Sequence, residues 1–247
     1  GLTAIRYGFE GKMDFAVAAV ILAAFLDGID GRVARFLKST SRFGAEMDSL
    51  ADFLNFGVTP AILLYFSYLH NIQPVGWIAV LIFSICACLR LARFNVQLDN
   101  PNQPKWKQNF FIGVPAPAGA IVAMLPIYMQ LLGLPQNDYT DIGVALFLVC
   151  IGLLLVSNLP TYSGKSLGAA IPRNIVLPLI IALIILLSVL FSYPWQTLIA
   201  ISILYLAAIP IGLKYYKMSE KKALESEANK AKPKKSRSTK RAASKKS

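Results

Sequence analysis

Long apolar runs separated by short polar connectors constrain the fold of this chain more than any other feature. Seven such runs lie near residues 15–26, 44–66, 75–94, 112–132, 142–156, 175–191 and 195–213. A helix needs about 20 apolar residues to cross the hydrocarbon core of a bilayer. Residues 1–9 look like the end of one more such segment, so we expect most of a first helix to be missing or processed away. The runs predict an all-α integral membrane protein, a polytopic bundle of about eight transmembrane helices.

The charge of the chain is low and unevenly distributed. Charged residues make up 15% of the 247 residues, whereas soluble domains carry about 25%. A separate soluble domain is therefore not expected, and residues 1–216 are interpreted as one transmembrane domain. Residues 217–247 hold twelve Lys/Arg against three Glu, which is nine of the net twelve positive charges.

This Lys-rich tail, residues 217–247, is predicted to be disordered and cytoplasmic. It serves either topology and solubility or docking on anionic lipid headgroups, where each basic residue contributes about 1 kcal/mol. Both interpretations stay open. Nucleic acid is not expected as a partner, because the tail lacks the aromatic platforms on which bases stack.

The connectors alternate in charge, which predicts the orientation of the chain. Lys and Arg occur in the connector after residue 31, in 95–111, in 157–173 and in the tail, whereas 67–74, 133–140 and 192–194 have none. Basic connectors stay on the cytoplasmic side. The basic connectors are therefore predicted to face the cytoplasm, in a bacterial cytoplasmic membrane.

Four carboxylates gather in a chain that has only thirteen acidic residues. Asp27 and Asp30 are three residues apart, and Asp48 and Asp52 are four apart, so on helices each pair shares a face. Charges at membrane depth are costly unless they are paired or bind a cation, so such a cluster indicates a functional site. The alternative is two helix ends whose acids face water.

The chemistry of these residues suits a nucleoside diphosphate. Carboxylates are preferred ligands of Mg²⁺ or Mn²⁺, and four of them can hold two ions about 3.5–4 Å apart that clamp a pyrophosphate. Gly31 and Gly44 lack a Cβ and allow a nucleotide close to the backbone, and Ala34 keeps the same face small. The guanidinium of Arg35 matches phosphate oxygens.

At these residues the chain resembles a known family. Residues 27–52 read D-x2-D-G-x2-A-R-x8-G-x3-D-x3-D, which is similar to the signature of CDP-alcohol phosphotransferases at every fixed position. Segments 48–52, 56–61, 90–95 and 113–117 resemble the phosphatidylserine synthase branch of that family. The resemblance covers nearly all of the membrane body and none of the tail.

The resemblance implies transfer of a phosphatidyl group from CDP-diacylglycerol to L-serine with release of CMP, by an enzyme that is usually a homodimer. It implies that four residues bind two divalent ions: Asp27, Asp30, Asp48 and Asp52. Asp52 would also be the catalytic base that takes the serine proton. Five residues would hold the CDP moiety: Asp30, Gly31, Ala34, Arg35 and Gly44.

Three basic residues outside the motif have two interpretations each. Arg90 and Arg93 could anchor a helix end at the interface or bind the serine carboxylate or the lipid phosphate, and Lys165 is a weaker candidate for the same task. The sequence leaves the acceptor open. The metal motif does not distinguish serine from glycerol phosphate, inositol phosphate or choline as the molecule that receives the phosphatidyl group. An intramembrane cation transporter would explain the aspartates but not Gly31, Ala34, Arg35 and Gly44.

Overall fold

The chain is helical apart from one short two-stranded ladder, within the part that the structure describes. This computed structural model describes the chain except residues 37–41, 99–109, 158–159, 163–172, 211 and 213–247. The predicted disordered tail and Lys165 lie outside the described residues.

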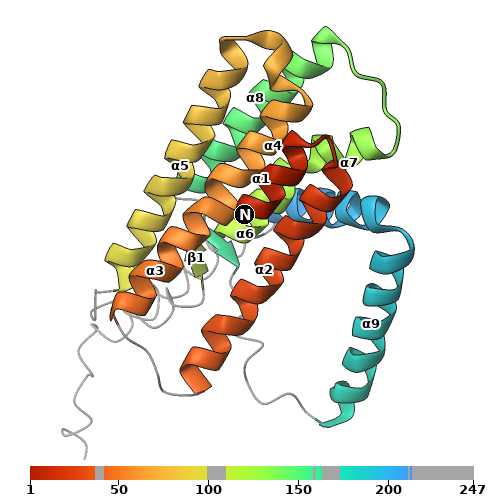
Figure 1. Cartoon of the computed structure of the whole chain (residues 1–247). Helices are drawn as coiled ribbons and strands as arrows, with labels where there is room; N and C mark the ends of the chain where they lie inside the picture. Colours follow the sequence, from red (N-terminus) through yellow and green to blue (C-terminus); the bar gives the residue numbers. More distant parts are fainter. Residues whose placement is uncertain (37–41, 99–109, 158–159, 163–172, 211, 213–247) are drawn as a thin grey trace, which may run out of the picture.

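The helices follow one another up and down through the molecule (Figure 1). The first half comprises α1 Leu2–Phe9, α2 Met13–Phe36, α3 Arg42–Asp52, the π-helix η1 Phe53–Val58, α4 Thr59–Ser67, the 3₁₀-helix η2 Leu69–Ile72 and α5 Val75–Leu98. The second half comprises β1 Phe110–Ile112, α6 Ala116–Ala123, α7 Leu125–Leu131, α8 Asp138–Val156, β2 Pro160–Tyr162, α9 Arg173–Ser192 and a last helix, Pro194–Pro210.

Three helices are long and apolar enough to cross a membrane: Phe43–Ser67, Val75–Val96 and Tyr139–Val156. On α5 the exposed side chains Leu81, Ile85 and Leu89 recur every four residues and form one apolar stripe along the helix. An exposed apolar stripe of this kind is stable against lipid rather than water. The protein is therefore membrane-embedded, while the number of about eight spans stays a prediction.

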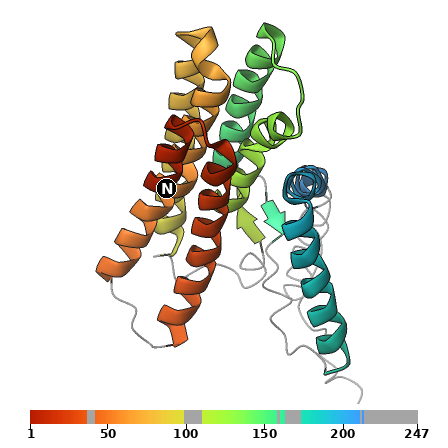
Figure 2. The same ribbon diagram turned by 45° about the vertical axis from the view of Figure 1, so that its right-hand side comes forward.

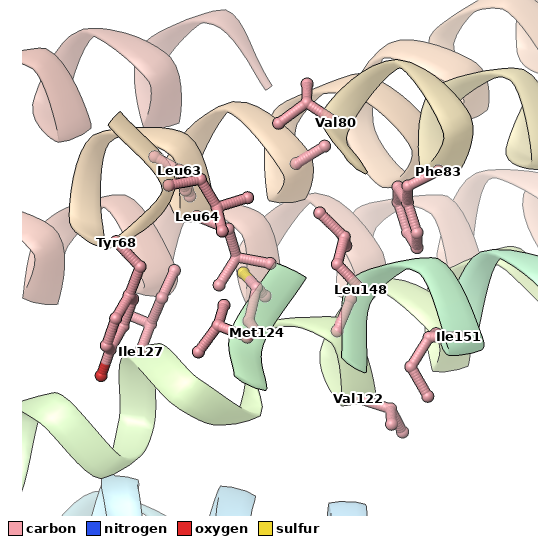
Figure 3. Packing of buried hydrophobic residues seen from close by; sticks show 14 of the residues in the cluster. Leu63, Leu64, Tyr68, Val80, Phe83, Val122, Met124, Ile127, Leu148 and Ile151 are labelled. Carbon is pink, nitrogen blue, oxygen red and sulfur yellow. The ribbon is translucent and has the colours of Figure 1, made fainter. Parts of the chain in front are cut away.

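The core lies where α4, α5, α7 and α8 meet (Figure 3). Leu64 of α4, Phe83 of α5, Ile127 of α7 and Leu148 of α8 are fully buried in one cluster. Close packing of these buried side chains holds the four helices against one another. It lies above the lower ends of α2, α3 and α5 in Figure 1, and leaves those ends available for a site.

Helix α2 extends beyond the apolar run, into residues 32–36, which the sequence assigned to a connector. Helix α2 continues from the apolar run through Asp27 and Asp30 as far as Phe36. Residues 31–36 include good helix formers and no proline, so the local sequence allows the helix to continue after Asp30. The first two aspartates are therefore held by a helix on both sides.

The helix that carries Asp52 is irregular before Pro60, where one turn is a π-helix. Pro60 lacks an N–H and its ring cannot approach the carbonyl four residues before it. The preceding turn widens to η1, and both the amide and the hydroxyl of Thr59 donate to the carbonyl of Leu54, the hydroxyl at 2.8 Å. The widened turn follows directly after Asp52, a frequent position for such turns at functional sites.

The single helix predicted over 112–132 is wrong. Residues Phe110–Ile112 pair antiparallel with Pro160–Tyr162, and two short helices follow, α6 and α7, with a break at Met124. Pro126 cannot donate the hydrogen bond that a continuous helix would need. The chain enters α6 through Gly113, whose φ of 83° and whose approach to the carbonyl of Leu155 exclude a side chain.

The last helix, Pro194–Pro210, has a direction that the sequence did not predict. It runs across the molecule at the end of α9, and Figure 2 shows it almost end-on while the other long helices stand upright. At 17 residues it is shorter than the three spanning helices. Tyr205 and Leu206 of this helix border a small apolar crevice that Val114 and Ile151 line from the other side.

Candidate active site

Three of the predicted metal ligands converge in the structure. Asp27 and Asp30 of α2 and Asp48 of α3 place carboxylate oxygens within 4.8 Å of one another. Asp27 is half-buried, and the other two are exposed at the lower end of the bundle. Three like charges this close repel one another strongly unless a cation lies among them. The geometry thus provides oxygen ligands of the kind that hard divalent cations prefer.

Asp52 lies beside this cluster, on the side toward the core. Its half-buried carboxyl group pairs with that of Asp27 and interacts electrostatically with Asp48 and with Arg90 of α5. The fourth predicted aspartate therefore lies within electrostatic range of both the acidic cluster and Arg90, one of the two predicted arginines. The structure brings Asp27, Asp30, Asp48, Asp52 and Arg90 together.

Both arginines of α5 are bound to backbone carbonyls. The Nε of Arg90 donates to the carbonyl of Val114 at 3.0 Å, and Nη1 of Arg93 donates to the carbonyl of Val156 at 2.8 Å. Val156 is the last residue of α8, where carbonyls have no partner in their own helix and a cation is favourable. These bonds give both side chains an anchoring role, and binding of an anion stays a prediction.

A polar pair that the sequence did not single out lies next to the aspartates. Asn95 Nδ2 of α5 donates to Ser49 Oγ of α3 at 3.0 Å, and Ser49 Oγ lies 3.0 Å from the carbonyl of Ala45. Both side chains are half-buried. The sequence marked the aspartates of segment 48–52 and the arginines of segment 90–95. Nothing in the sequence indicated that Ser49 and Asn95 touch.

The remaining predicted site residues are described in part. Gly44 lies exposed in α3, and Gly31, Ala34 and Arg35 belong to the helical backbone of α2, while their surroundings and Lys165 lie outside what the structure describes. The role of these residues toward a nucleotide therefore stays a prediction.

Two family profiles match this chain, and both describe CDP-alcohol phosphatidyltransferases. A profile described as CDP-alcohol phosphatidyltransferase matches residues 2–161, and a second, described as CDP-alcohol phosphatidyltransferase 2, matches residues 174–210. The first match contains all four aspartates and both arginines of the site.

Relatives that match most of this chain are named CDP-diacylglycerol–serine O-phosphatidyltransferase. The protein of that name from Mycobacterium bovis is 41% identical over 217 residues, which cover 87% of this chain and 74% of the relative. The one from Mycobacterium leprae is 39% identical over 218 residues, covering 86% and 70%. The one from Helicobacter pylori is 35% identical over 212 residues, covering 83% and 82%.

Proposed function

The chain belongs to the CDP-alcohol phosphatidyltransferase family, and on that premise we propose that it transfers the phosphatidyl group of CDP-diacylglycerol to L-serine and releases CMP. The observation that carries the proposal is the convergence of three carboxylates from α2 and α3 within 4.8 Å. The names of the relatives support serine as the acceptor.

The residues fit a divalent-metal centre. Asp27, Asp30 and Asp48 offer only carboxylate oxygens, which suit Mg²⁺ or Mn²⁺ better than softer ions. We propose that these three residues and Asp52 hold two such ions. When bound, the ions neutralise the diphosphate and stabilise the charge that develops on the attacked phosphoryl group.

The CDP moiety is proposed to bind along the motif. Carboxylate and small side chains leave room for a nucleotide close to the backbone of α2 and α3, and a guanidinium suits its phosphate oxygens. The residues concerned are Asp30, Gly31, Ala34, Arg35 and Gly44.

Asp52 is proposed as the base. The oxygen of the serine hydroxyl bonds to the phosphorus that carries diacylglycerol, the bond from this phosphorus to the bridging oxygen of the diphosphate breaks, and CMP leaves with that oxygen. Asp52 takes the hydroxyl proton. Its position beside Asp27 and Arg90 keeps it next to the acidic cluster and in a half-buried setting, where a proton acceptor is screened less by water.

Arg90 is proposed to face the anionic part of the acceptor or of the lipid phosphate, with Arg93 and Lys165 as further candidates. Arg90 is supported by its electrostatic interaction with Asp52. The Nε of Arg90 is engaged by Val114, so an anion would be met by the outer nitrogens of the guanidinium.

The arrangement in the membrane is part of the proposal. We propose about eight membrane helices within residues 1–216, an active site facing the cytoplasm of a bacterial cell, a Lys-rich tail at 217–247 that rests on anionic lipid, and a homodimer. Charge alternation along the connectors supports the orientation.

An assay of CMP release tests the function. Purified full-length protein is mixed with CDP-diacylglycerol, Mn²⁺ or Mg²⁺, and one acceptor at a time: serine, glycerol phosphate, inositol phosphate or choline. We expect CMP and a new lipid with serine and not with the other three, and no turnover in excess chelator. Turnover with another acceptor alone would replace serine, and full turnover in chelator would overturn the metal-assisted reaction.

A further inference from the structure

Helix α3 carries Asp48 and Asp52 but packs little against the rest of the protein. Its large apolar side chains point away from the bundle: Phe43 is 75% exposed and Leu50 is 64% exposed. On the opposite face Ser49 and Asp52 are half-buried. Burial of apolar side chains is what normally fixes the direction of a helix, so α3 depends on other contacts for its orientation.

A hydrogen bond between Asn95 of α5 and Ser49 of α3 joins the two helices. Asn95 Nδ2 lies 3.0 Å from Ser49 Oγ, and Asn95 Oδ1 lies 3.3 Å from the same atom. Ser49 in turn meets the carbonyl of Ala45 at 3.0 Å, one turn earlier in α3. The amide of Asn95 is thereby joined to the backbone of α3 through one hydroxyl group.

The end of α5 that supplies Asn95 is itself firmly held. Arg90 binds the carbonyl of Val114 before α6, and Arg93 binds the carbonyl of Val156 at the end of α8. Charge-assisted bonds of this kind are stronger than neutral ones. A chain of bonds therefore runs from α6 and α8 through α5 to Ser49, which directly follows Asp48 in sequence.

We propose that Asn95 and Ser49 are positioning residues that hold α3 so that Asp48 meets Asp27 and Asp30. The inference rests on the proposed function, because it concerns the cation that these aspartates would bind. Neither Asn95 nor Ser49 needs to touch the substrate. Groups that orient metal ligands commonly change metal affinity by about 10- to 100-fold when they are removed.

Mn²⁺ binding to purified protein in detergent tests the proposal without turnover. Free Mn²⁺ is measured by electron paramagnetic resonance for the wild type, Asn95→Ala, Ser49→Ala, Ser49→Thr and the double variant. We expect about tenfold weaker binding for each alanine variant, near-normal binding for Ser49→Thr because it keeps the hydroxyl, and a double variant no weaker than the weaker single one.

Ser84→Ala is the matched control. Its hydroxyl also lies on α5 and donates to a carbonyl, that of Gly57 at 3.4 Å, but not to α3. We expect this variant to bind Mn²⁺ like the wild type. Thermal unfolding of every variant separates weaker binding from loss of fold, and if Asn95→Ala does not fold, the contrast between Ser49→Ala and Ser49→Thr decides.

The two hypotheses fail in different ways. Unchanged Mn²⁺ affinity in folded Ser49→Ala and Asn95→Ala would overturn the positioning role, and so would additive losses in the double variant. In both cases the wild type still binds Mn²⁺ and releases CMP. A wild type that neither binds Mn²⁺ nor releases CMP would instead overturn the proposed function itself.

Discussion

At the scale of single residues, the two aspartates within each pair differ in their surroundings. Asp30 and Asp48 are exposed, whereas Asp52 is half-buried beside Asp27 and Arg90. Spacing along the sequence predicted that each pair shares a helix face, and in the structure carboxylate oxygens of Asp27, Asp30 and Asp48 lie within 4.8 Å of one another. The difference in burial depends on what packs against α3, which spacing does not reveal.

Replacing the proposed base should separate chemistry from binding. We expect Asp52→Asn to lower phosphatidyl transfer by about 10²- to 10⁴-fold, because the serine proton loses its acceptor. Binding of CDP-diacylglycerol should largely persist, because the three clustered carboxylates remain. The measurements are CMP release and retention of labelled CDP-lipid.

Asp14→Asn is the control for this change, since Asp14 lies exposed in the first turn of the same helix α2, away from the cluster. It should leave both quantities unchanged. Loss of CDP-lipid binding together with transfer in Asp52→Asn would argue that Asp52 is needed for the metal centre rather than as a base.

The two arginines should respond differently to truncation. Arg90→Ala should raise the serine KM, because Arg90 is the arginine that interacts with Asp52. Arg93→Ala should mainly lower stability, by about 1.5–3 kcal/mol, because the terminal carbonyl of α8 loses a charged donor. Initial rates against serine concentration and thermal unfolding in detergent measure the two effects. An unchanged serine KM in Arg90→Ala would leave anchoring as its only role.

At the scale of helices, the sequence predicted the positions of long helices better than the breaks and irregular turns within them. The apolar runs near 75–94 and 142–156 correspond to α5 and α8, which the structure extends by a few residues at one end. Hydropathy does not report the break at Met124 or the π-helix before Pro60, because both depend on which carbonyl accepts each N–H. The pairing of β1 with β2 joins segments about fifty residues apart, which no local pattern indicates.

The turn between α1 and α2 carries basic residues although it lies at the end of the molecule that is predicted to face away from the cytoplasm. Lys12 lies at the opposite end of α2 from the acidic cluster. Glu10 pairs with Lys12 at 3.0 Å and with Arg6 at 2.9 Å, and these hydrogen bonds lower the pKa of its carboxyl. The positive-inside rule counts Lys and Arg and gives acidic residues little weight, so the two basic residues of this turn count against the predicted orientation.

The π-helix should be sensitive to any side chain added at Gly57. A Cβ at this position would lie 2.9 Å from the Cβ of Ala87 on α5 and 3.0 Å from the ring of Phe53. We expect Gly57→Ala to destabilise the protein by about 1–3 kcal/mol and to lower transfer, because η1 directly follows Asp52. Thermal unfolding and CMP release provide the measurements.

Gly143→Ala is the matched change in an open position. Gly143 is exposed within α8, and a Cβ added there would have no neighbouring atom within 4 Å outside the backbone of its own helix. This variant should be unchanged or stabilised by about 0.5–1 kcal/mol, because alanine favours a helix. Equal unfolding temperatures for the two variants would contradict tight packing of η1 against α5.

At the scale of the whole molecule, the turns divide between two ends. The turn at η2 and the one leading into α8 lie at the upper end in Figure 1, and the ends of α2 and α5 lie at the lower end with the β1–β2 ladder. Local sequence predicted this division through the charges of the connectors. It did not predict the crossing direction of the Pro194–Pro210 helix, because the tilt of a helix is set by packing against its neighbours, which hydropathy does not report.

Labelling from one side tests the predicted orientation. In a variant without native cysteines, Pro135→Cys places a thiol in the exposed turn before α8, and Glu46→Cys places one on exposed α3. An impermeant maleimide should label the first in intact spheroplasts and the second only after permeabilisation. The reverse order would invert the orientation, and equal labelling of both in intact spheroplasts would contradict two separate ends.

The location of the acidic cluster at one end of the bundle has a consequence for the membrane itself. A phospholipid synthesised there enters a single leaflet, the one that this end faces. A zwitterionic or charged headgroup crosses the hydrocarbon core only at high cost, so the new lipid stays on the side of its synthesis until another protein carries it across. The transferase would therefore exchange lipid headgroups within one monolayer only, and the appearance of its product in the opposite monolayer would depend on a flippase.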